Sequence, residues 1–251
     1  MEKEWLMQNF LDWNIIRALA MRTFRHSIES PIAYVVAIFF YGFVGGIFGM
    51  DFFTNNQGSI EGVGVIAPWL LWFVVPALTM GLISEELRSG TYEQLSTLPI
   101  RDWEIVLGKF IGFALLSLCL VLGLAFYPLV IAFITDGVRG LDWGATLGVL
   151  AGLYLLMLVY GAMGLYASSM AKNQVVALIM GMIFCTILFF IGQFYFHFPG
   201  FLSRVADFAG VVSHLNTLNR GVWDLRDLLY FLSVTFIFLY FTVQKLTARR
   251  F

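Results

Sequence analysis

Charged residues are scarce in this chain of 251 residues: they make up 12% of it, against about 25% in an ordinary soluble domain. Hydrophobic residues make up 60%, and the mean hydropathy is +0.84. We therefore expect most of the surface to face lipid rather than water. The net charge of −1 argues against a nucleic-acid partner, which would favour a basic surface.

Cysteine is rare, and the common enzyme motifs are missing. Cys119 and Cys185 both lie inside apolar runs, which excludes a disulfide framework and a metal-ligand spacing. The sequence contains no H-E-x-x-H, no G-x-S-x-G and no G-x-x-x-x-G-K-[ST] phosphate cradle, since Gly108-Lys109 is followed by Phe110. We therefore expect no catalytic residue, no metal and no cofactor. If ATP drives this protein, another polypeptide binds the ATP.

Six long intervals contain no Asp, Glu, Lys or Arg, and each is long enough for the roughly 20 residues that cross a bilayer. The chain is thus predicted to be an all-α membrane protein, a single domain over 1–251 with six transmembrane helices. The three histidines (His26, His197 and His214) also lie outside these spans, which argues against a proton- or sodium-driven mechanism. The spans are predicted at about 31–50, 63–83, 110–134, 146–169, 174–195 and 228–245.

Basic residues are distributed unevenly on the two sides of these spans. With six spans both termini lie on one side, and that side carries 11 of the 15 Lys and Arg residues. Because basic residues concentrate on the cytoplasmic side, we predict that both termini are cytoplasmic, together with segment 84–109. Charges at Glu2, Lys3 and Glu4 argue against a cleavable signal peptide.

Residues 1–29 have the pattern of an interfacial helix in the headgroup layer, although a solvated leader is the alternative. Ser30-Pro31 then starts a new helix, with serine as the cap and proline in the first turn. The two faces of the leader differ: Trp13, Ile16, Ala20 and Phe24 lie on one, and Asn14, Arg22 and Arg25 lie on the other.

Residues 196–227 form neither a spanning helix nor a plain loop. This outer region is either an amphipathic helix on the membrane surface or a re-entrant hairpin, and the sequence does not choose between them. One helical face would carry Phe201, Val205, Phe208 and Val212, and the other Ser203, Asp207 and His214.

Glycines recur at four-residue spacing inside the spans, which lets helix backbones approach closely. They are Gly42/Gly46, Gly45/Gly49 and Gly144/Gly148/Gly152. Such pairs indicate packing within one chain or, alternatively, a dimer interface.

A polar, acidic stretch, SEELRSGTYEQLSTLP at 84–99, separates the second and third spans. With its continuation to residue 112 it resembles the segment after the second span of type-2 ABC exporter permeases. That pattern has an acidic pair, Gly-Thr, an acidic residue, Leu, Pro, Trp and Gly-Lys, and here it ends at Trp103 and Gly108-Lys109. The stretches 30–40, 167–177 and 220–235 are similar to the permease subunit of gliding-motility-type ABC transporters.

The resemblance implies a permease of the bacterial inner membrane that dimerises, with a second copy or a related permease, and docks two copies of an ABC ATPase subunit. A short cytoplasmic coupling helix between spans two and three would sit in a groove of that ATPase. Gly90 would separate two short helices and Pro99 would end the second. The residues predicted to couple to the ATPase are Glu85, Glu86, Gly90, Thr91, Tyr92, Glu93, Leu95, Leu98 and Pro99.

Several alternatives stay open at this point. The segment 84–109 could be a solvated loop, although 26 residues are more than the roughly two to eight that a reversal needs, and Glu85 and Glu86 could simply end the second span. Minor contacts with the ATPase are expected at 245–251 and at Lys172-Asn173. The protein could also be a membrane scaffold that moves no substrate, or a channel lined by Thr79, Ser117, Ser168 and Thr186.

Overall fold

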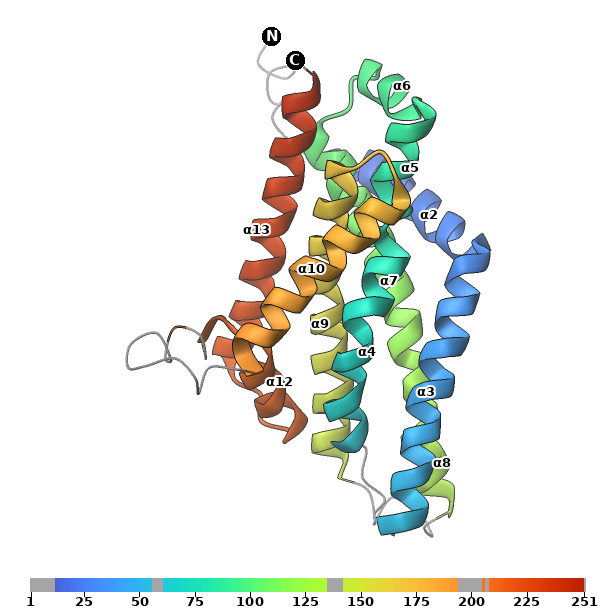
Figure 1. Cartoon of the computed structure of the whole chain (residues 1–251), viewed down its shortest axis with the longest axis vertical. Coiled ribbons are helices and arrows are strands. Elements are labelled where there is room, and N and C mark those ends of the chain that lie inside the picture. Colours follow the sequence, from blue (N-terminus) through green and yellow to red (C-terminus); the bar gives the residue numbers. More distant parts are fainter. Residues whose placement is uncertain (1–11, 56–60, 135–141, 194–204, 206–207, 251) are drawn as a thin grey trace.

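The fold is all-helical. The computed structural model describes residues 12–55, 61–134, 142–193, 205 and 208–250, and none of these forms a strand. Most of the long helices run roughly along one axis of the molecule (Figure 1). They are α2 (Trp13–Glu29), α3 (Pro31–Asn55), α4 (Glu61–Thr79), α5 (Gly81–Ser89), α6 (Thr91–Thr97), α7 (Asp102–Leu124), α8 (Phe126–Ile134), α9 (Trp143–Met170), α10 (Gln174–Gln193), α12 (Val211–Asn219) and α13 (Leu225–Arg250).

Within the described residues, six helical stretches are long and apolar enough to cross a membrane, which confirms the predicted number of spans. The last residues predicted for the fifth span, 194–195, lie outside the described residues. Two spans are longer than predicted at one end: the second continues through α5 to Ser89, and the third begins at Asp102. These helices therefore extend beyond the uncharged runs and include charged residues.

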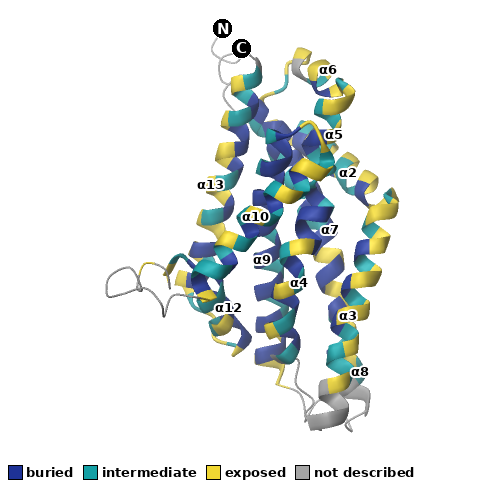
Figure 2. Cartoon of the chain, viewed as in Figure 1, coloured by how far each residue is buried: buried dark blue, intermediate teal, exposed yellow. Residues whose placement is uncertain are grey.

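Helix α9 is the centre of the bundle. In its most apolar part 67% of the residues are buried, against 17% in α3 (Figure 2). It packs against α4, α7, α10, α12 and α13. Its buried side chains include Leu153, Leu156, Met157, Tyr160 and Met163, all 2% exposed or less.

Helix α2 packs closely on α7 because two glycines of α7 leave room for it. A methyl group at Gly108 would lie 2.6 Å from Cβ of Leu19, and one at Gly112 would lie 2.7 Å from the carbonyl oxygen of Ala20. Ile16 and Ala20 are therefore buried against protein. Part of the predicted apolar face of the leader thus covers α7, whereas Trp13 on the same face is 67% exposed. The interfacial position of α2 stays a prediction.

Helix α12 packs beside the beginning of α9. Methyl groups at Gly148 and Gly152 would meet Leu218, and one at Gly148 would overlap its carbonyl oxygen. These glycines therefore pack within one chain. The choice between a surface helix and a re-entrant hairpin for the outer region stays open. Phe201, Ser203 and Asp207 lie outside the described residues.

The beginning of α2 and the end of α13 meet at the start of α7, at the same end of the bundle as α6 (Figure 1). The backbone N–H of Asp12 donates to Oε1 of Glu104 at 2.8 Å, and the hydroxyl of Thr247 donates to Oδ2 of Asp102 at 2.9 Å. The two ends of the described chain therefore lie on one side of any membrane that the bundle crosses.

Candidate functional site

Helices α5 and α6 form a short helical hairpin between α4 and α7, in which α5 is also the end of the second apolar stretch. Gly90 separates them with φ at +75°, a left-handed conformation that costs glycine little because it has no Cβ. Helix α6 ends at Thr97, and Leu98 is extended before Pro99. The helix break at Gly90 and the stop before Pro99 are where the sequence predicts them.

A serine of α9 fixes the beginning of α5. The first N–H groups of a helix lack partners within it, and here Ile83 and Ser84 donate theirs to Oγ of Ser168 at 3.0 and 2.9 Å. The Ser168 hydroxyl donates in turn to the carbonyl oxygen of Met80 at 2.8 Å. Ser168 is fully buried. It therefore holds the junction between α4 and α5 against the central helix.

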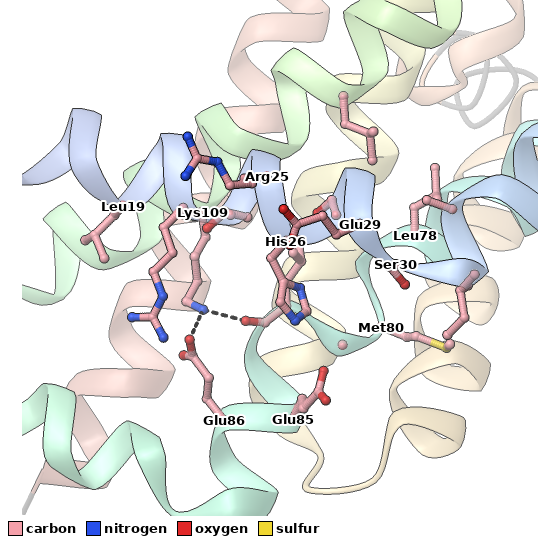
Figure 3. A pocket seen from close by; sticks show the side chains of 18 of the residues that line it. Leu19, Arg25, His26, Glu29, Ser30, Leu78, Met80, Glu85, Glu86 and Lys109 are labelled. Atoms are coloured by element: carbon pink, nitrogen blue, oxygen red, sulfur yellow. Dashed lines mark hydrogen bonds and ion pairs between the residues drawn. The ribbon is translucent and has the colours of Figure 1, made fainter.

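An ion pair joins α5 to α7. The Nζ atom of Lys109 lies 2.7 Å from Oε1 of Glu86 and donates to the carbonyl oxygen of Leu82 at 2.6 Å (Figure 3). The side chains of Lys109 and Glu86 are only 6% and 20% exposed. Because breaking a buried pair leaves an uncompensated charge, this contact resists separation of the two helices.

Tyr92 fixes the beginning of α6. It is 5% exposed and belongs to an apolar cluster with Ile83, Val106 and Leu246, which come from α5, α7 and α13. The hairpin is therefore attached at three points, by Ser168, by Lys109 and by Tyr92.

The predicted coupling residues divide into three groups. Glu86 and Tyr92 face the chain itself, because Lys109 binds Glu86 and the apolar cluster buries Tyr92, so their role in coupling stays a prediction. Gly90 and Leu95 are half-buried. The side chains that are exposed to a partner are Glu85, Thr91, Glu93, Leu98 and Pro99.

A cavity of about 780 Å³ lies beside the hairpin and was not predicted from the sequence. Helices α2, α3, α4, α5 and α7 form most of its wall, and Thr91 of α6 and Gln174 of α10 complete it. Figure 3 shows His26, Glu85, Glu86 and Lys109 around it. Its walls come from segments as far apart in the sequence as Ala18 and Gln174, so no local motif could have indicated it. The cluster of basic side chains on α2 is a sequence feature that indicates one wall of this cavity.

Polar side chains inside the spans bond to backbone rather than line a path. Thr79, Ser117 and Thr186 donate to carbonyl oxygens of their own helices, at Val75, Phe113 and Met182. These three hydroxyls therefore satisfy backbone carbonyls within their own helices. In the described part of the chain, no three His, Cys, Asp or Glu side chains gather as a metal site.

These features define a multi-pass membrane protein with a helical hairpin attached rigidly to one end of its bundle. Comparison with known proteins identifies the family: the model of ABC-2 family transporter proteins matches residues 8–244. The chain therefore belongs to the ABC-2 transporter family and is a permease-type membrane protein.

A relative supports this assignment. The probable ABC transporter permease protein NosY of Stutzerimonas stutzeri is 28% identical over 131 residues, which are 51% of this chain and 48% of that protein. The alignment thus spans about half the length of the relative. The narrower resemblance to gliding-motility-type permeases stays a prediction.

Proposed function

We propose that this protein is the transmembrane permease subunit of an ATP-driven ABC exporter of the bacterial inner membrane. It dimerises with a second permease chain and couples to a separate ATPase subunit, two copies per complex, through the α5–α6 hairpin. Both termini and the hairpin then lie in the cytoplasm. The membership of the ABC-2 family supports this proposal.

The observation that carries the proposal is that the hairpin is exposed on one side and attached on the other. Glu93 and Leu98 face outward, and Leu98 is 50% exposed. Ser168, Lys109 and Tyr92 connect the same hairpin to α9, α7 and α13. A push on α6 therefore moves the spans with it. A scaffold that only recruits an ATPase requires the exposed surface of the hairpin but does not require its rigid attachment to the spans.

The proposed dimerisation is supported by α3. This helix is the least buried of the six spans. Methyl groups at Gly42, Gly46 and Gly49 would have no atom of the chain within 4 Å, so the small-residue face of α3 is open. Close helix approach on such faces is common between membrane helices.

The experiment is to reconstitute the permease with its ATPase and measure ATP hydrolysis. The double variant Glu93→Lys/Leu95→Asp should lose the stimulation of hydrolysis by the permease while it inserts normally. The matched control is Asn216→Lys/Val222→Asp, which adds the same two residues on exposed positions at the opposite end of the bundle. Unchanged stimulation in the hairpin variant would contradict the docking role.

A further inference from the structure

The cavity beside the hairpin combines charged walls with an apolar interior. Three cationic side chains line it (Arg22, Arg25 and Lys109), and three carboxylates do so as well (Glu29, Glu85 and Glu86). Lys109 and Glu86 neutralise one another. Among the described residues, none of the other four has an ion-pair partner within 4 Å. The cavity thus offers unpaired charges of both signs.

The apolar part extends away from these charges along the bundle. Ala77, Leu78 and Leu116 line it together with Ile32 of α3. Leu116 lies seven residues beyond Lys109 on α7, about 10 Å farther along the helix axis. The space therefore suits a guest with a polar head and an apolar chain.

The cavity borders the surface that faces the bilayer. Met21 and Ile32 belong to its lining and are 47% and 42% exposed. Ile32 lies in the first turn of α3, and Met21 lies about two turns before the end of α2. A lipid can therefore reach the cavity sideways, without passing through the protein.

We propose that this cavity binds one zwitterionic glycerophospholipid with a primary ammonium group, of the phosphatidylethanolamine type. The guanidinium groups of Arg22 and Arg25 bind its phosphodiester, because guanidinium forms charge-assisted hydrogen bonds with phosphate oxygens. Glu85 and Glu29 accept hydrogen bonds from the ammonium group, and an acyl chain lies along Leu78 and Leu116. An anionic lipid would leave both carboxylates without a cation.

The proposed lipid connects α2 to α5, the first helix of the hairpin. It therefore fixes the distance between the leader and the α5–α6 hairpin. This inference does not rest on the proposed transport function, because binding can be measured on the full chain without any ATPase.

The test is native mass spectrometry of the full-length protein, stripped of lipid in detergent and incubated with one lipid at a time. We expect one phosphatidylethanolamine per chain. It should be retained about tenfold more strongly than phosphatidylglycerol or phosphatidylcholine, because a tenfold difference corresponds to about one charged hydrogen bond. Arg22→Gln and Glu85→Gln should each lower retention, whereas Arg17→Gln and Arg88→Gln, on the same helices but outside the cavity, should not. Equal retention of the three lipids would overturn the proposal.

A second pair of variants tests the apolar part of the cavity. Ala33→Trp fills the cavity from α3 and should abolish retention, while Val35→Trp places the same side chain on the exposed face of α3 and should have no effect. Retention that survives Ala33→Trp would overturn the proposal. So would inorganic phosphate that binds alone and displaces the lipid, because it would identify a site for phosphate rather than for a lipid.

Discussion

The Nδ1 atom of His214 lies 2.6 Å from Oδ1 of Asp227, and both side chains are buried. The other ring nitrogen, Nε2, lies 3.0 Å from the carbonyl oxygen of Phe208. The imidazole also stacks on the ring of Tyr230 with a centroid distance of 4.0 Å. These contacts hold α12 to the first turn of α13, so His214 belongs to the interior and not to the polar outer face that the sequence predicts.

The first prediction concerns this pair. Asp227→Leu removes the partner of a buried imidazole and should lower the free energy of unfolding by about 2 kcal/mol, the cost of leaving a buried polar group unsatisfied. Asp227→Asn keeps an acceptor oxygen at the same place and should cost less. Thermal unfolding of the purified protein in detergent measures both. Equal losses for the two variants would contradict a role of the carboxyl oxygen as the acceptor.

The second prediction concerns Lys109 and Glu86. Lys109→Met leaves the half-buried carboxylate of Glu86 without its cation and should destabilise the protein by about 3 kcal/mol. Replacing both partners removes the unpaired charge, so Lys109→Met/Glu86→Leu should be more stable than Lys109→Met alone. The same unfolding assay compares them. A double variant whose loss equals the sum of the two single losses would show that the residues do not interact.

The number and place of the spans could be predicted because a run of about 20 apolar residues has few alternatives to crossing a bilayer. The second span was predicted to end too early and the third to begin too late, and both errors have the same cause. The prediction ended each span where a charged residue appears. However, Glu86 of α5 and Lys109 of α7 form an ion pair and neutralise one another. Their helices can therefore continue beyond the uncharged runs.

The hairpin was predictable in part. Gly90 and Pro99 are local signals, and the backbone breaks at both. Tertiary packing decides whether a side chain is buried. The sequence places Tyr92 and His214 at the surface, but packing against other helices buries both. The cavity is lined by residues of seven helices, an arrangement that the periodicity of one helix cannot encode.

The third prediction concerns glycine packing. Gly148→Ala should destabilise the protein by about 1–3 kcal/mol, the usual cost of overpacking, because its methyl group would overlap the carbonyl oxygen of Leu218. Gly46→Ala places the same methyl group in open space on α3 and should change stability by less than about 1 kcal/mol. Thermal unfolding of monomeric protein in detergent tests this pair. A tolerated Gly148→Ala would mean that α12 does not pack so closely on α9.

The last prediction concerns Gly90. A methyl group there would meet no atom within 4 Å, so any effect of Gly90→Ala comes from the backbone angle and not from a clash. At a φ of +75° an L-residue with a Cβ costs about 1–2 kcal/mol, and this strain should loosen the junction between α5 and α6. Asparagine visits the left-handed region more readily, so Gly90→Asn should be milder. The measurement is stimulation of the partner ATPase, with thermal unfolding as the control for folding. If alanine and asparagine reduce stimulation equally, the junction does not depend on the left-handed conformation, and the fixed angle between α5 and α6 is not what transmits the movement.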